Sequence, residues 1–217
     1  MRRFDLVIFD CDGVLIDSEP IANAVFSRQL ATVGMDFTPE QVMRTFIGRS
    51  RDSCIAMAGE IRGEKLPADF ARKWDDALHE ALDREAKPVE GIPELLRWLE
   101  IPFCVASNGE PEHMRRGLTA AGLMPLVKGR LFSAQEVARP KPAPDVYLHA
   151  ASRMGATPGR CAVVEDTPTG VKAGIAAGMT VFGYVGGPQS DAATLRELGA
   201  KPFERMAELR GLLTPQR

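Results

Sequence analysis

The stretch "FDLVIFDCDGVLIDSE" (residues 4–19) runs from apolar residues directly into two carboxylates, Asp10 and Asp12, which a glycine follows. The nearly continuous apolar character of residues 6–9 predicts a strand that is buried on both faces, as in a parallel sheet. Two carboxylates at the end of such a strand repel each other, so a cation, hydrogen bonds or a shared proton must offset their charge. An isolated D-x-D-G is more often an acidic loop with a turn than a functional site. Residues elsewhere in the chain must therefore show which of the two it is.

The composition is typical of a globular protein with a sizeable core: 217 residues, of which 45% are hydrophobic and 26% charged. The 27 basic and 29 acidic residues form no long block of one sign, so we expect neither nucleic acid nor a membrane surface as a partner. The first apolar run is too short, and too interrupted by acids, for a signal peptide. The four cysteines form no C-x-x-C pair, and we expect reduced thiols in a cytoplasmic protein.

Three further aliphatic runs, at residues 102–107, 161–166 and 180–185, also predict strands. Helical patterns separate these runs, and Pro93 and Pro111 stand at plausible first positions of helices. Strands that alternate with helices predict an α/β fold with a doubly wound parallel sheet. In such a fold, ligands bind outside the carboxyl ends of the strands.

Residues 18–86 differ from the rest because they contain several helical patterns and no strong strand. The segment 38–41 reads as a capping box that begins a helix, and residues 69–85 predict a longer helix. We therefore expect a small helical cap domain at 18–86, inserted into a discontinuous core domain made of residues 1–17 and 87–217.

Polar residues also follow the second and third predicted strands. Ser107 and Asn108 end one of them, Glu165 and Asp166 end the other, and Lys141 lies between two prolines in the segment that separates them. Each has an ordinary alternative: a helix N-cap for Ser107, a solvated loop for Lys141 and an acidic helix start for the two acids. Their joint occurrence at strand ends favours a single site at one edge of the sheet.

The segments "DCDGVLIDSE", "ASNG", "KPAPD" and "VVEDTPTGVKAGIAAGM" resemble, in order and spacing, the four motifs of the haloacid dehalogenase-like superfamily. The resemblance covers nearly the whole chain and is closest to phosphatases with a small helical cap, the group of β-phosphoglucomutase and 6-phosphogluconate phosphatase. It implies a Rossmann-like core and phosphoryl transfer, a reaction that depends on in-line positioning and on neutralising charge on oxygen.

The resemblance implies a role for each residue of the site. Asp10 would be the nucleophile that forms an aspartyl phosphate, and Asp12 the acid and base, a task that favours a carboxyl of raised pKa. In an extended chain these two residues share a face. Ser107 and the backbone N–H of Asn108 would bind phosphate oxygens, and Lys141 would add positive charge.

The resemblance also implies a bound Mg²⁺, which suits a site of carboxylate, carbonyl and phosphate oxygens. Asp10, Asp166 and the backbone carbonyl of Asp12 would hold the ion, and Glu165 would help directly or through water. Such a cation would offset the charge of the paired acids at the end of the first strand.

The remaining imidazole and indole side chains give no sign of a second site. His79, His113 and His149 are scattered and lack the spacing of a metal site. Trp74 and Trp98 are expected in the core.

Within the predicted cap, "FIGRSRDS" (residues 46–53) resembles the family's loop that reads the substrate. Gly48, Arg49, Ser50 and Arg51 occupy it, and an arginine there could bind a second anionic group or sugar hydroxyls. A solvated loop is the alternative, and Arg51 is the better candidate of the two arginines.

One departure from the family pattern bears on the reaction. Mutases of this group carry a histidine five residues after the aspartate that corresponds to Asp17, where this chain has Ala22. Hydrolysis is therefore favoured over mutase activity. Dehalogenase activity is disfavoured because those relatives lack a carboxylate at the position of Asp12.

We therefore expect a monomeric, Mg²⁺-dependent phosphatase that acts on a small phosphomonoester, such as a sugar phosphate or the sugar-acid phosphate 6-phosphogluconate. Alternatives from other classes are a phosphoaspartate signalling receiver and a non-catalytic phosphometabolite-binding protein. A receiver would place its acceptor aspartate at a later strand and needs no cap.

Overall fold

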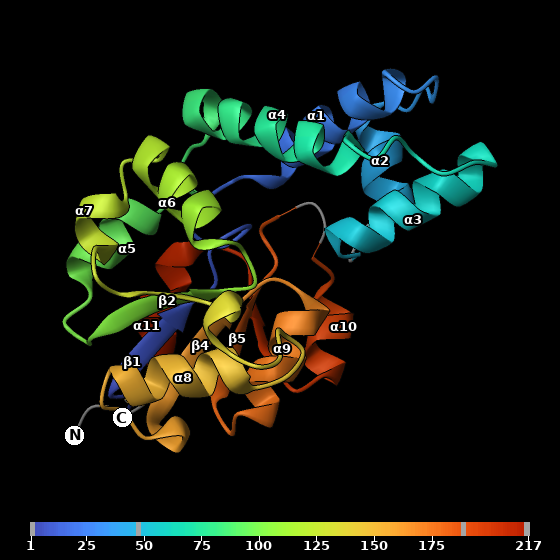
Figure 1. The fold of residues 1–217 in the computed structure, drawn as a ribbon. Helices are drawn as coiled ribbons and strands as arrows, with labels where there is room; N and C mark the ends of the chain where they lie inside the picture. The colour runs from blue at the N-terminus through green and yellow to red at the C-terminus, as the bar shows by residue number, and fades with distance from the viewer. Residues whose placement is uncertain (1–2, 47–48, 188–189, 215–217) are drawn as a thin grey trace.

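The computed structural model describes residues 3–46, 49–187 and 190–214 (Figure 1). Within these residues a six-stranded, fully parallel sheet has the order β3-β2-β1-β4-β5-β6. The strands are β1 (Leu6–Phe9), β2 (Phe103–Ser107), β3 (Leu131–Ser133), β4 (Cys161–Glu165), β5 (Thr180–Tyr184) and β6 (Lys201–Phe203). This order confirms the predicted doubly wound sheet, and its topological switch point lies between β1 and β4.

Side chains of the strands alternate between two hydrophobic clusters, one on each face of the sheet. In β1, Val7 and Phe9 belong to one cluster, and Leu6 and Ile8 to the other. Helices α5 (Ile92–Trp98), α6 (Pro111–Ala120), α7 (Met124–Val127) and α11 (Leu209–Leu213) cover the first face. Helices α8 (Asp145–Arg153), α9 (Pro168–Ala176) and α10 (Ala192–Glu197) cover the second. Burial on both faces explains why the strands read as continuous apolar runs.

The chain between β1 and β2 forms α1 (Glu19–Ala31), α2 (Pro39–Phe46), α3 (Arg51–Arg62) and α4 (Phe70–Glu85), which lie beyond the carboxyl ends of the strands (Figure 1). Phe26 of α1 joins them, because its ring stacks on Trp74 at 3.9 Å and meets the edge of Phe46. The predicted capping box is present: Thr38 N donates to Gln41 Oε1, and Gln41 N donates to Thr38 Oγ1. Helix α4 also packs against α6.

The indole of Trp98 differs from the prediction. Trp98 is 40% exposed, and the guanidinium of Arg210 lies 5.2 Å from its ring centroid, so a surface cation–π contact replaces burial in the core. The other predictions for buried side chains are confirmed, because Trp74 and all four cysteines are buried and the cysteines are free. Among the described helices, none is long and apolar enough to cross a bilayer.

Candidate active site

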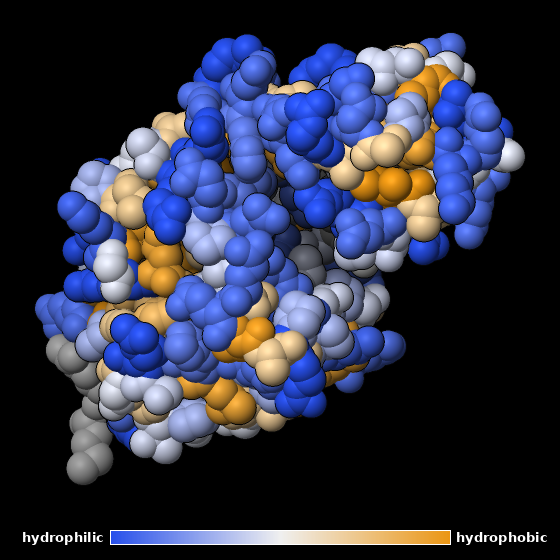
Figure 2. Space-filling model, viewed as in Figure 1, coloured by the Kyte–Doolittle hydropathy of each residue, from blue (hydrophilic) through white to orange (hydrophobic). Residues whose placement is uncertain are grey.

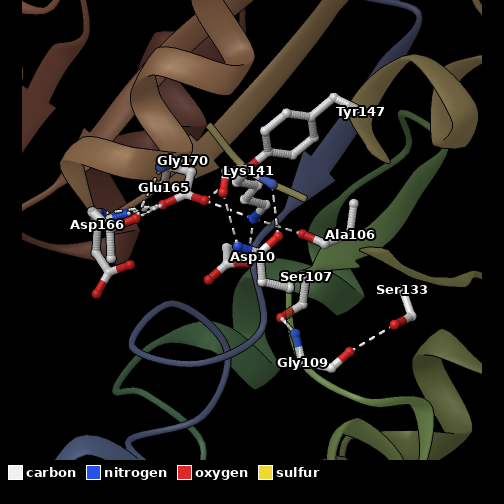
Figure 3. Close-up of polar contacts among 12 residues, drawn as sticks. Asp10, Ala106, Ser107, Gly109, Ser133, Lys141, Tyr147, Glu165, Asp166 and Gly170 are labelled. Atoms are coloured by element: carbon white, nitrogen blue, oxygen red, sulfur yellow. Dashed lines mark hydrogen bonds and ion pairs between the residues drawn. The ribbon is translucent and has the colours of Figure 1, made fainter. Parts of the chain in front are cut away.

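The ammonium group of Lys141 lies buried between two carboxylates at the switch point (Figure 3). Its Nζ donates to Asp10 Oδ1 at 2.6 Å, to Glu165 Oε1 at 2.7 Å and to the carbonyl of Ala106 at 2.9 Å. These contacts use all three of its donors. Burial alone would lower the pKa of Lys141, but the two carboxylates raise it above its ordinary value. At 6% exposure this side chain is not the solvated loop lysine of the alternative interpretation.

Glu165 is the centre of the polar network. Its Oε1 accepts from Lys141 and from the hydroxyl of Tyr147 at 2.7 Å. Its Oε2 accepts from Asp166 N at 3.0 Å, from Thr167 N at 3.1 Å and from Thr167 Oγ1 at 2.9 Å. Burial would raise the pKa of Glu165, but the lysine and these donors hold it below its ordinary value. Both carboxylate oxygens are thus occupied by protein donors.

Two glycines make room for the acids of the site. A Cβ on Gly170, in the first turn of α9, would overlap the carboxylate of Glu165. Gly13 has φ +75°, and a Cβ there would overlap the carboxylate of Asp166. Each acid therefore depends on a bare backbone supplied by another segment.

Three carboxylates form a group that suits a cation. Asp10, Glu165 and Asp166 each offer an oxygen, and these oxygens lie within 4.8 Å of one another. Asp166 Oδ1 is buried and has no hydrogen-bond partner among the described residues. Burial and the neighbouring acids raise the pKa of Asp166 well above its usual range and that of Asp10 to about 7. Three acids beside one lysine leave negative charge uncompensated, which fits a divalent cation bound by oxygen ligands.

The side chain of Asp12 has different surroundings from that of Asp10. Ser18 Oγ donates to Asp12 Oδ1 at 2.7 Å, and His113 Nε2 lies 3.4 Å from the same oxygen. Burial alone would raise the pKa of Asp12, but His113, Ser18 and the charge of Lys141 bring it below its ordinary value. The acid-base task favours a raised pKa, whereas the hydrogen bonds and positive charge around Asp12 lower it in the protein without substrate. The two acids of the first motif therefore have pKa values shifted in opposite directions.

The end of β2 is fastened to the Lys141 segment. Asn108 Oδ1 accepts from Lys141 N at 2.9 Å, and Asn108 Nδ2 donates to the Lys141 carbonyl at 3.3 Å. The buried Ser107 Oγ accepts from Gly109 N at 3.0 Å. Ser107 thus caps a local turn, whereas the N-cap of α6 is Glu110. Asn108 also lines the cavity between this edge of the sheet and helices α1–α4.

A cavity of about 760 Å³, here called the reaction cavity, brings the strand ends and the cap loop together between α1–α4 and the sheet. Figure 2 shows the molecule hollowed between these two parts. The residues that line the reaction cavity are Asp10, Asp12, Glu19, Arg49, Ser50, Arg51, Ser107, Asn108, Gly109, Lys141, Pro142, Glu165, Asp166, Thr167, Pro168 and Thr169. All predicted site residues are among them except Gly48, which lies outside the described residues.

Arg51 of the cap loop is already paired. Its Nη1 donates to Asp75 Oδ2 at 2.5 Å, and its Nε lies 3.4 Å from Asp52 Oδ1. Ser50 is the N-cap of α3 and accepts from Ser53 N. The loop is therefore held by acids and a cap of the same helical part, and Arg51 does not present a free charge.

Several residues of the site were not predicted, among them Ser18, Glu19, His113 and Tyr147. Further residues that line the reaction cavity and were not predicted are Gly109, Pro142, Thr167, Pro168 and Thr169. His113 and Tyr147 lie in the first turns of α6 and α8, and in a parallel sheet such turns begin at the edge where the strands end. That position is the signal that could have revealed them. Glu19 lines the reaction cavity, and burial, together with Asp12 and Asp17, raises its pKa to about 7.

A family profile described as haloacid dehalogenase-like hydrolase matches residues 4–178. The chain belongs to this family. Among its relatives, 6-phosphogluconate phosphatase of Escherichia coli (strain K12) is 31% identical over 191 residues, which are 88% of this chain and 86% of that protein. Hexitol phosphatase A of the same strain is 34% identical over 185 residues, covering 81% and 80% of the two chains.

Solved structures agree with this assignment. A haloacid dehalogenase family hydrolase from Deinococcus radiodurans R1, with bound phosphate and sodium, superimposes with a TM-score of 0.83 at 36% identity. The match covers 100% of both chains. The predicted family and fold of this haloacid dehalogenase-like hydrolase are thereby confirmed.

Proposed function

We propose that this haloacid dehalogenase-like hydrolase is a Mg²⁺-dependent phosphatase of small phosphomonoesters, with a sugar or sugar-derived leaving group. The observation that carries the proposal is the buried Lys141 between Asp10 and Glu165. Beside it lies an Asp166 oxygen that has no hydrogen-bond partner among the described residues. A strand-end carboxylate held by a lysine and flanked by a cation site is suited to accept a phosphoryl group. The phosphatase names of the relatives and the phosphate in the Deinococcus structure support it.

We further propose that residues 1–17 and 87–217 act as the core domain and residues 18–86 as a cap. The core residues would perform the chemistry, and the cap would select the leaving group. The position of the reaction cavity between α1–α4 and the strand ends supports this division.

In the proposed reaction, the negative charge of the bound phosphate would raise the pKa of Asp12, so that this carboxyl holds a proton when substrate is present. An Asp10 oxygen attacks phosphorus, and the ester oxygen departs with the proton from Asp12. Asp12 then takes a proton from water, which attacks the aspartyl phosphate and releases phosphate. Ser18 and His113 would hold Asp12 in place, and Lys141 would hold Asp10. Mg²⁺ held by Asp10, Asp166 and the Asp12 carbonyl would neutralise charge on the phosphoryl oxygens.

Phosphate release from a panel of phosphorylated metabolites tests this function. We expect turnover with Mg²⁺ and its loss after EDTA treatment, with recovery when Mg²⁺ is restored. Full activity of the chelated, metal-free protein would contradict the metal assignment. Binding of phosphate esters without turnover of any of them would favour the non-catalytic binding protein.

A further inference from the structure

We propose that the substrate's leaving group is an uncharged, hydroxyl-rich chain or ring, and that it lies in a second pocket between α4 and α6. This inference rests on the proposed function and specifies its substrate class. The pocket, here called the α4–α6 pocket, has a volume of about 370 Å³, at the lower end of the roughly 300–1,000 Å³ usual for small-molecule sites. It shares Ser50, Arg51, Asn108 and Gly109 with the reaction cavity, so the two hollows adjoin.

His113 connects the proposed chemistry to this pocket. Its Nε2 lies 3.4 Å from Asp12 Oδ1, and its ring centroid lies 5.8 Å from that of His79 on α4. Asp12 is the proposed acid for the leaving oxygen, so the leaving group begins beside it. Both histidines line the α4–α6 pocket, which therefore extends from the leaving-group side of the reaction cavity.

The charges that line the α4–α6 pocket decide what it accepts. Three of its described residues are acids: Asp52, Asp75 and Glu110. Arg51 is the one lysine or arginine among them, and Asp75 and Asp52 already pair with it. Arg49 lines the reaction cavity but is not among the residues that line this pocket.

A carboxylate at the far end of a substrate would thus meet three acids. Arg51 and His113, two basic side chains of the lining, already pair with Asp75 and Asp12, which disfavours a sugar acid. Hydroxyl groups suit the pocket because each can donate to a carboxylate and accept from an imidazole or guanidinium N–H. The apolar parts of Trp74 and Leu78 complete the lining and suit the C–H groups of a sugar.

A matched substrate pair tests the inference. Sorbitol 6-phosphate and 6-phosphogluconate share a six-carbon chain with phosphate on C6, and C1 is a hydroxymethyl group in the first and a carboxylate in the second. With Mg²⁺ present, we expect kcat/KM to be about tenfold or more higher for sorbitol 6-phosphate. Hydrolysis of p-nitrophenyl phosphate, measured in parallel, reports on the chemistry alone.

The variant Asp75→Asn connects the preference to this pocket. It removes one of the two charges that pair with Arg51, so the ratio of the two kcat/KM values should shift toward 6-phosphogluconate by about tenfold. Asp76→Asn is the matched control, because Asp76 is on the same helix and pairs with Arg72 at 3.1 Å. Asp76 is not one of the described residues that line the α4–α6 pocket. The control should keep the wild-type ratio.

Equal or higher kcat/KM for 6-phosphogluconate in the wild-type enzyme would overturn the inference. A ratio that Asp75→Asn leaves unchanged would overturn it as well, because the preference would then arise elsewhere. If p-nitrophenyl phosphate is hydrolysed in either case, the proposed function survives. Absence of all phosphomonoester hydrolysis would overturn the function and the inference together.

Discussion

The hydroxyl of Tyr147 donates a 2.7 Å hydrogen bond to Glu165 Oε1, the oxygen that also accepts from Lys141. Both partners are fully buried, and the lysine Nζ lies 4.7 Å from the centre of the tyrosine ring. Tyr147 therefore fixes Glu165, and through it Lys141 and Asp10, from the second side of the sheet. Because the phenol donates to an ionised acceptor, its removal leaves a buried charge with one partner fewer.

Tyr147→Phe should lower the free energy of unfolding by about 1.5–3 kcal/mol, the usual contribution of a hydrogen bond to a charged group. We also expect a lower kcat, because Glu165 loses the hydrogen bond that fixes its carboxylate, and Glu165 in turn positions Lys141. Urea unfolding and steady-state kinetics measure the two effects. Tyr184→Phe is the matched control, since the Tyr184 hydroxyl has no hydrogen bond within the described residues, and it should change neither quantity appreciably. Equal effects of the two substitutions would contradict the role of Tyr147.

Gly170→Ala tests the close approach of α9 to Glu165. The added Cβ would overlap the carboxylate, so the helix or the acid must move, and overpacking of this kind costs about 1–3 kcal/mol. Activity should fall with stability, because Glu165 positions both Lys141 and the Asp166 backbone. Gly211→Ala in α11 is the control, since a Cβ there meets no atom of the described residues within 4 Å and alanine favours a helix. Wild-type activity of Gly170→Ala would show that the acid tolerates displacement.

The sequence predicts the centre of this fold better than its edges. Strands β1, β2, β4 and β5 are mostly apolar and almost entirely buried because helices cover both faces. The edge strands β3 and β6 are three residues each, "LFS" and "KPF", which is too short for a periodic pattern. The prediction of a buried Trp98 is wrong because the guanidinium of Arg210, 112 positions later in the chain, covers its ring at the surface.

The same limit applies to the site. Motif residues that end neighbouring strands are predictable, because parallel strands bring their carboxyl ends to one edge. The lowered pKa of Asp12 is not predictable from the sequence, because one of its hydrogen-bonding partners, His113, lies 101 positions away. The partner of Arg51 is Asp75, 24 positions away on another helix, and no spacing rule connects two such residues.

Binding of Mg²⁺ should strengthen as pH rises through about 7. Burial raises the pKa of Asp10 to about 7 and that of Asp166 well above its usual range, so protons compete with the cation at lower pH. Each proton displaced changes the apparent affinity by about tenfold per pH unit below the pKa. Calorimetric titrations at pH 6, 7 and 8 measure this dependence. An affinity that is constant over the range would show that these carboxylates are ionised without the metal.

The raised pKa of Asp10 gives the stability of the metal-free protein the opposite dependence on pH: it falls as pH rises. Asp10 binds its proton more tightly in the folded state, so its contribution to stability is present near pH 4 and is lost as pH rises to about 7. The increase in Tm on adding Mg²⁺ should therefore be larger at pH 8 than at pH 6. Asp10→Asn removes this contribution and should reduce the difference between the two pH values.

Asp10 and Asp12 should give distinct defects. Asp10→Asn cannot form a phosphoenzyme, because the amide is not a nucleophile. Asp12→Asn should slow phosphorylation and dephosphorylation, each by about a hundredfold or more. Rapid quench with a radiolabelled substrate separates the two steps. Trapping a phosphoenzyme on Asp10→Asn would overturn the nucleophile assignment.

The last prediction concerns Arg51, which is 44% exposed and lines both the reaction cavity and the α4–α6 pocket. Asp75 and Asp52 engage Nη1 and Nε, and the remaining N–H groups can donate to a substrate hydroxyl. Arg51→Ala removes these N–H donors and also the ion pairs of Arg51 with Asp75 and Asp52. A charge-assisted hydrogen bond at a half-exposed site is consistent with a loss of about tenfold in kcat/KM for a polyol phosphate.

A minimal substrate separates recognition from chemistry at this position. p-Nitrophenyl phosphate offers no hydroxyl chain, so its kcat/KM should change much less in Arg51→Ala than that of the polyol phosphate. Arg72→Ala is the matched control, because Arg72 is a cap arginine paired with Asp76 and absent from the described lining of both hollows. Equal losses on both substrates would assign Arg51 to the transferring phosphate or to the placement of the cap. No loss on either substrate would return it to the solvated-loop interpretation.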